Sequence, residues 1–255
     1  MTAAVRLALA TFAGAALGAA GMKLATRPAP AAPAPTPAAG ARRAACPVHT
    51  DAAGGLQVDD QKETERLRQA LRDGIFAPWA EQGRAPTPDE FAQRMKLSPS
   101  DANALLDRLQ ACGEAVGGGI LRAPESELIA VAWPLANLPT GITVTIPGGK
   151  PAFARCAIDA LGVSELLQKR AVVEAAARDN GAPIRILVDG DAIVSATPPD
   201  VVVVKGRGCD DMSFYSSRAA ADAWRAQHDP GATVFTLPEA VRRGAKIFSH
   251  ETAGL

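Results

Sequence analysis

The stretch Phe153-Ala-Arg-Cys156-Ala-Ile-Asp159-Ala-Leu161 places a thiol and a carboxyl three residues apart in the chain. Residues at positions i and i+3 of a helix share one face, so Cys156 and Asp159 should point the same way from a first helical turn. Thiolates are soft ligands that select soft metals, and a nearby carboxyl can carry a proton. The stretch therefore predicts a helix start that supports chemistry on a soft metal ion.

A second cysteine, Cys209, follows the strongly apolar stretch Val201–Val204. The loop between them contains Lys205 and Arg207, and cations beside a thiol favour its reactive thiolate form. Loops at the ends of strands commonly carry functional residues. Cys209 is therefore the predicted partner of Cys156.

Further motifs accompany the two cysteines, namely Gly181-Ala-Pro183, Cys209-Asp-Asp-Met-Ser-Phe214-Tyr-Ser-Ser217, Ala223-Trp224-Arg-Ala-Gln-His228 and Leu237-Pro-Glu239-Ala240. Together with the Cys156 stretch they resemble the organomercurial (alkylmercury) lyase family, over roughly residues 142 to 250. One departure is visible, because family members often carry two adjacent cysteines at the second site and here Asp210 follows Cys209.

The resemblance implies an enzyme that cleaves a carbon–mercury bond by protonation and yields a hydrocarbon and Hg(II). It implies that Cys156, Asp159 and Cys209 are catalytic, and that Cys156 and Cys209 hold the mercury of substrate and product as thiolates. It also implies that no organic cofactor is needed. Organomercurial small molecules would be the substrates, and cellular thiols or a mercuric reductase would accept the product ion.

Two other functions and two structural interpretations stay open on the residues alone. The same core could serve a thiol-based carrier of mercury or copper without turnover, or a metal-responsive winged-helix regulator. Cys156 could be a buried and inert cysteine. Asp159 could be an acid that stabilises the helix dipole or caps the helix.

The composition sets the outer limits for these hypotheses. The 255 residues allow one or two domains, and 27 basic residues balance 27 acidic ones, which gives no general attraction to nucleic acid. The four cysteines are Cys46, Cys112, Cys156 and Cys209, widely spaced, so no disulfide framework is expected. Cys112 is expected to pack at the end of a helix. His228 and His250 have no partner that the sequence identifies.

Residues 1–57 are predicted to lie outside the fold as an apolar segment followed by an unstructured Ala/Pro-rich leader. The apolar residues 7–21 follow Arg6 and resemble the core of a signal peptide, with a short membrane anchor or a mis-called start as alternatives. The protein would be exported or membrane-tethered if this segment is used, and otherwise cytoplasmic. Cys46 and His49 are soft-metal ligand types within this leader, and their role stays open.

Residues 58–135 are predicted to form three helices and a small hairpin, a winged-helix-like arrangement. The first helix should run from Asp59 to Ala80 with a stop near Pro78, and the capping signals at residues 87–90 and 98–101 should open the other two. A DNA-reading role is disfavoured, since the third helix carries Asp101 and Asp107 against the single Arg108. The family resemblance implies instead that such a module closes over the catalytic core.

Residues 136–255 are predicted to form a mixed α/β core of the alkylmercury lyase type, so the fold class is α+β. Strands are expected at residues 142–146, 171–173, 184–188, 201–204 and 233–235, with helices at residues 217–228 and 238–247.

Overall fold

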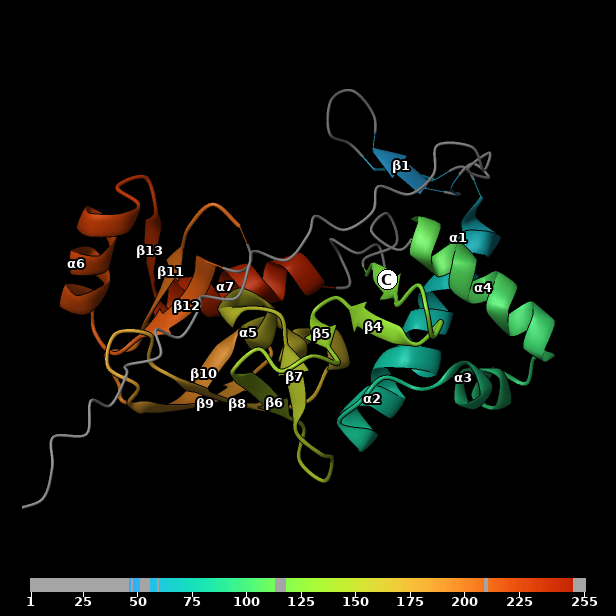
Figure 1. Ribbon diagram of the computed structural model, residues 1–255, viewed down its shortest axis with the longest axis horizontal. Coiled ribbons are helices and arrows are strands. Elements are labelled where there is room, and N and C mark those ends of the chain that lie inside the picture. Colours follow the sequence, from blue (N-terminus) through green and yellow to red (C-terminus); the bar gives the residue numbers. More distant parts are fainter. Residues whose placement is uncertain are drawn as a thin grey trace, which may run out of the picture. The chain divides into compact units, whose positions relative to one another are not determined.

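The protein is described by a computed structural model that covers residues 46, 48–50, 56–58, 60–112, 118–208 and 211–249, with only the backbone of residues 48–50 and 56–58 (Figure 1). The helices are α1 (Gln61–Gln69), the π-helix η1 (Ala70–Phe76), α2 (Ala77–Gln82), α3 (Pro88–Met95), α4 (Pro99–Cys112), α5 (Ala157–Leu167), α6 (Arg218–His228) and α7 (Leu237–Phe248). This mixture of helices and strands confirms the mixed α/β character.

An eight-stranded antiparallel sheet has the order β10-β9-β8-β6-β7-β5-β4-β3. Its strands are β3 (Ile120–Arg122), β4 (Ile129–Ala132), β5 (Leu135–Ala136), β6 (Ile142–Thr145), β7 (Ala152–Ala154), β8 (Ala171–Ala176), β9 (Pro183–Asp189) and β10 (Ala192–Thr197). A second sheet of three strands has the order β12-β11-β13, formed by β12 (Met212–Tyr215), β11 (Val202–Lys205) and β13 (Thr233–Thr236).

Helices α5 and α7 lie side by side against the larger sheet and also contact the smaller one (Figure 1). Neighbouring residues of a strand point to opposite faces of a sheet. In the small sheet, buried apolar side chains lie on both faces. Val203 and Phe214 belong to the main core, whereas Val202 and Tyr215 belong to a second cluster beneath α6. Helix α5 is buried along most of its length and contacts strands of both sheets.

Helices α5 and α7 contact each other closely at two glycines, Gly162 and Gly244. A Cβ atom on Gly162 of α5 would lie 2.7 Å from the carbonyl oxygen of Gly244 in α7, and it would also meet the Phe248 ring. A Cβ atom on Gly244 would lie 2.7 Å from the carbonyl oxygen of Ile158. Small residues at both positions therefore set the distance between α5 and α7.

Gly162→Ala should destabilise the protein by about 1–3 kcal/mol, because the added methyl group forces two packed backbones apart. Urea unfolding of the variant and the parent measures this difference. Gly208→Ala is the matched control, since nothing lies within 4 Å of a Cβ atom there. Equal stability of Gly162→Ala and the parent would contradict the close crossing.

The N-terminal helical run continues further than its sequence suggests. The sequence predicts a stop near Pro78, but residues 61–82 are helical throughout, and Gly83 ends the run with φ 73°. The wider turns of η1 come just before the proline, and the Ala77 N–H donates to the Arg72 carbonyl five residues back. This geometry accommodates a proline that lacks an N–H of its own.

Helices α3 and α4 start where the sequence predicts. Thr87 caps α3 in a reciprocal capping box with Glu90, and Pro88 occupies the first turn. Ser98 Oγ accepts a hydrogen bond from the Asp101 N–H at the start of α4. Local capping chemistry was sufficient to place both helices.

The winged-helix description of residues 58–135 is not confirmed. Strands β3 and β4 form the expected hairpin, but β4 pairs with β5 and β5 pairs with β7. The hairpin therefore extends the eight-stranded sheet of the core. The predicted boundary after residue 135 falls within β5, and the division into modules stays a prediction.

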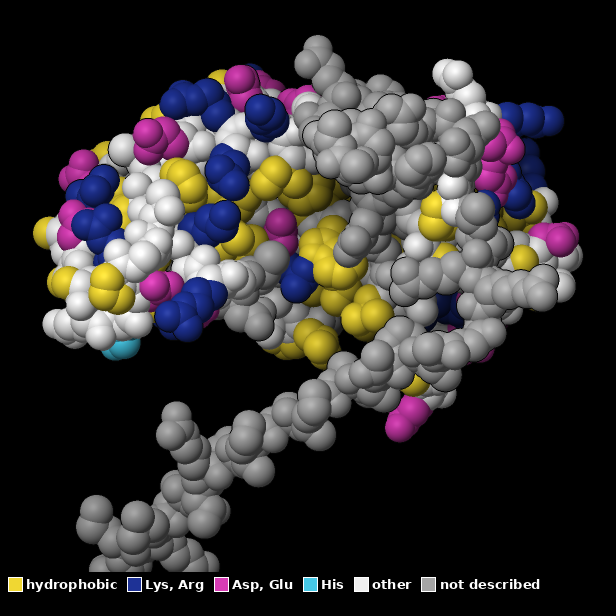
Figure 2. All heavy atoms as spheres, turned by 90° about the horizontal axis from the view of Figure 1, so that it is seen from above, with side chains coloured by type: hydrophobic (Ala, Val, Ile, Leu, Met, Phe, Trp, Pro, Cys, Tyr) yellow, Lys and Arg dark blue, Asp and Glu magenta, His cyan; other side chains and the backbone are white. Residues whose placement is uncertain are grey.

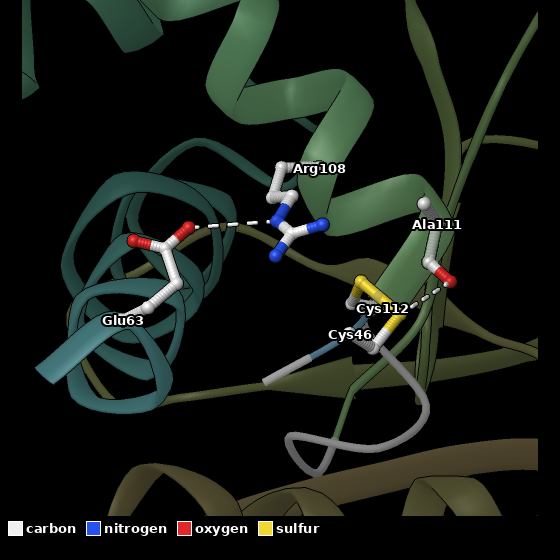
Figure 3. The surroundings of a disulfide bond; sticks show 5 residues. All are labelled: Cys46, Glu63, Arg108, Ala111 and Cys112. Atoms are coloured by element: carbon white, nitrogen blue, oxygen red, sulfur yellow. Dashed lines mark hydrogen bonds and ion pairs between the residues drawn. A yellow bond between two sulfur atoms is a disulfide. The ribbon is translucent and has the colours of Figure 1, made fainter. Parts of the chain in front are cut away.

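The sequence predicts no disulfide framework and only a packing role for Cys112, whereas Cys112 forms a disulfide. The end of the leader at residue 57 stays a prediction. Cys46 is bonded to Cys112 at the end of α4 (Figure 3). Strand β1 (Val48–Thr50) pairs with β2 (Leu56–Val58). Cys46 Sγ also lies 3.6 Å from the Ala111 carbonyl oxygen. Sequence spacing does not reveal a pairing between cysteines 66 positions apart, because only the fold brings them together.

The apolar residues 7–21 lie outside the described residues. Within the part of the chain that the structure describes, no helix is both long and apolar enough to cross a membrane.

Cys112→Ser should lower the free energy of unfolding by up to about 4 kcal/mol, because the disulfide closes a long loop in the unfolded chain. Thermal melting of the oxidised parent and the variant, each with and without reductant, measures the effect. Reductant should lower the melting temperature of the parent and leave that of the variant unchanged. A parent that melts at one temperature in both conditions would show that the disulfide does not stabilise the fold.

Candidate functional site

The candidate site is built at the first turn of α5, directly after β7. Cys156 is the N-cap of this helix, and its Sγ accepts a hydrogen bond from the Asp159 N–H at 3.5 Å. A sulfur here takes the place that a serine or threonine oxygen usually holds. The positive end of the helix dipole favours a thiolate at this position. The predicted helix start and the shared face of Cys156 and Asp159 are thus both present.

Asp159 is buried, with 7% of its surface exposed, and its Oδ2 has no hydrogen-bond partner among the described residues. Burial raises the pKa of this carboxyl to about 6, while the Cys156 side chain and the Arg155 charge act in the opposite direction. Desolvation therefore dominates, since it disfavours the charged form of a buried acid. The carboxyl can hold and release a proton close to neutral pH.

A third sulfur reaches the site from the small sheet. Met212 begins β12, and its Sδ lies 3.7 Å from Cys156 Sγ. The methionine is half-buried and packs against the main core. Sequence reasoning did not single out Met212, although it lies three residues after the predicted Cys209.

Arg155, which directly precedes Cys156, packs its side chain over the ring of Trp133. The Arg155 guanidinium carbon lies 4.5 Å from the centre of the Trp133 ring, and the Arg155 N–H donates to the Pro134 carbonyl at 3.0 Å. A cation over an aromatic ring is held by the ring quadrupole. The segment before α5 is therefore anchored to the β4–β5 turn, which fixes where Cys156 begins the helix.

The remaining candidates lie elsewhere or outside the described residues. Cys209, Asp210 and His250 lie outside the described residues, as does the side chain of His49. His228 stacks on Trp224 at the end of α6, with Nδ1 3.0 Å from the Trp224 carbonyl oxygen. The described residues contain no group of three or more His, Cys, Asp or Glu side chains that could hold a metal ion.

The charge distribution gives no support to nucleic-acid binding. Figure 2 shows acidic and basic side chains interspersed on one face, with hydrophobic side chains between them. Arg122, the basic residue of β3, is engaged by Asp107 and Glu127 in ion pairs. Arg108 of α4 is 3.5 Å from Glu63 of α1 (Figure 3).

Comparison with known proteins shows which proteins this chain resembles. A family model described as alkylmercury lyase matches residues 135–249. Alkylmercury lyases of Bacillus cereus and Clostridium butyricum are each 32% identical over 120 residues, which is 43% of this chain and 54% of each relative. The match thus spans about half the length of these relatives. The alkylmercury lyase of Streptomyces lividans is 23% identical over 213 residues, 73% of this chain and 91% of the relative.

A solved structure shares the fold. The crystal structure of the mercury-bound form of MerB2 matches with a TM-score of 0.53 at 21% identity, and the match covers 74% of this chain and 98% of that chain.

Proposed function

We propose that the chain is an organomercurial lyase, which replaces a carbon–mercury bond by a carbon–hydrogen bond, because residues 135–249 match the alkylmercury lyase family model. The observation that carries the proposal is the buried pair of Cys156 and Asp159 on the first turn of α5, within the matched segment. The pair combines a soft metal ligand with a carboxyl that can hold a proton.

In the proposed mechanism Cys156 and Cys209 displace the thiols that carry the organomercurial and bind its mercury as thiolates. Soft sulfur ligands suit a soft metal and push electron density toward the carbon bound to mercury. The N-terminal end of α5 favours the thiolate form of Cys156. Support for Cys209 comes from Met212, which follows it by three residues and has its sulfur beside Cys156.

Asp159 is the proton carrier of the mechanism. It accepts a proton from a thiol as the substrate binds and delivers a proton to the carbon as the carbon–mercury bond breaks. The pKa of about 6, raised by burial, suits both directions of transfer. The electron pair of the broken bond becomes the new carbon–hydrogen bond, and Hg(II) stays on the two thiolates.

The proposed reaction needs no organic cofactor, because protonation of the carbon requires neither an oxidant nor a reductant. External thiols or a mercuric reductase would take Hg(II) from the two cysteines. We assign helices α1–α4 a covering role over the core, supported by the contact of α2 with β7, the strand that leads to Cys156.

Release of benzene from phenylmercury by the purified full-length chain, with excess thiol present, tests the proposal. More than one benzene per chain is the expected result. Stoichiometric mercury binding without benzene would identify a carrier instead. Neither the carrier nor the DNA-binding regulator is favoured by a described feature.

A further inference from the structure

The sulfur of Met212 has no role in the proposed protonolysis. It comes from β12 in the small sheet, whereas Cys156 and Asp159 come from α5. The two sulfurs nevertheless lie 3.7 Å apart, with the Cys156 thiol as donor and the thioether as acceptor. Two separate elements of the fold therefore bring a thioether to the reactive thiol.

We propose that Met212 is a third sulfur contact of mercury bound at Cys156. The inference rests on the proposed function, since it needs mercury at this thiol. A thioether is a soft ligand, like a thiolate, and suits the same class of soft metals.

The sulfur–sulfur distance fits a shared ion. Zinc–sulfur bonds of about 2.3 Å at a tetrahedral angle separate two sulfurs by about 3.8 Å, and the larger mercury ion holds two sulfurs slightly further apart. The observed 3.7 Å between Cys156 Sγ and Met212 Sδ is close to this value. One soft ion can thus contact both sulfurs without a large movement of either residue.

The charge of the site favours a thioether as the additional ligand. Two thiolates neutralise Hg(II), and a third thiolate would leave a net negative charge in a site where Cys156 is 1% exposed and Asp159 is 7% exposed. An uncompensated buried charge is costly, whereas a methionine adds a donor without charge or proton. Met212 therefore strengthens mercury binding yet leaves the ion available to external thiols.

Met212→Leu tests the inference, because leucine keeps the apolar volume and removes the sulfur. Met95→Leu is the matched control, since Met95 is also half-buried against the main core but lies at the end of α3. The full-length parent and both variants are loaded with Hg(II) and dialysed against increasing concentrations of a monothiol. The Cys46–Cys112 pair is the same in all three proteins, so differences between them report the Cys156 site.

Met212→Leu should lose half of its mercury at about tenfold lower thiol concentration than the parent, the lower end of the range for neighbours of a metal ligand. Met95→Leu should follow the parent. X-ray absorption of the loaded proteins should show one sulfur neighbour fewer in Met212→Leu. Equal retention by Met212→Leu and the parent, or an unchanged sulfur count, would overturn the inference.

Benzene release, scored separately on the parent, keeps the two proposals apart. A parent that holds mercury through Met212 but releases no benzene would contradict the lyase function and leave the third contact supported. A parent that releases benzene while Met212→Leu retains mercury equally well would contradict the third contact alone. A parent that neither retains mercury nor releases benzene would contradict both.

Discussion

Cys156→Ser should reduce hydrocarbon release to the level of solution without protein. An oxygen ligand is too hard to hold and activate organic mercury, so the reacting ion loses a ligand at the first step. Serine is a preferred N-cap residue, so the start of α5 should survive the change. A matching melting temperature and an absent benzene signal on the same sample would assign the loss to chemistry. Cys209→Ser should have the same effect on turnover.

Cys112→Ser serves as the control for loss of a cysteine. Cys112 is bonded to Cys46 and takes no part in the proposed reaction, so the variant should keep most of its turnover at a temperature where it stays folded. Normal benzene release by Cys156→Ser would contradict the two-thiolate mechanism.

Asp159→Asn should slow single-turnover hydrocarbon release by about 10²–10⁴-fold, the usual contribution of a general acid or base. The amide keeps the size of the side chain but carries no transferable proton. Both proposed sulfur ligands remain, so mercury binding should stay close to that of the parent. An Asp159→Asn protein that releases benzene at the parent rate would show that the carboxyl is not the proton carrier.

The same variant distinguishes a catalytic carboxyl from a structural one by its stability. The pKa of Asp159 is raised from 3.8 to about 6 in the folded protein, so the folded state binds more protons between these values. Stability from this group is therefore complete below about pH 4 and falls as pH rises through about 6, by about 3 kcal/mol. Asp159→Asn should thus be more stable than the parent at pH 8 and similar to it at pH 4. A helix-stabilising carboxylate predicts the opposite, a loss of stability at pH 8.

Local sequence signals were sufficient to predict helix starts, which depend on contacts between residues close together in the chain. Thr87, Pro88 and Glu90 predict the start of α3, and the Cys156 stretch predicts the start of α5. Both helix starts depend on hydrogen bonds between residues three positions apart, so the residue types at this short spacing predict them from the sequence.

Features that depend on distant pairing could not be read in this way. The Cys46–Cys112 disulfide joins segments that are far apart in the chain, and β5 joins the hairpin to the core sheet. Met212 lies within a motif that the family resemblance included, but its contact with Cys156 exists only because β12 approaches α5. The raised pKa of Asp159 likewise follows from burial in the folded chain.

A single turnover of phenylmercury in deuterium oxide tests the central claim most directly. The full-length chain is mixed with less than one equivalent of phenylmercury and excess thiol, and the benzene is analysed by mass spectrometry over time. Protonolysis at Cys156 and Asp159 predicts benzene that carries one deuterium, formed rapidly by the parent and severely slowed by Asp159→Asn. Phenylmercury that stays intact on the parent chain, bound but uncleaved, would contradict the account.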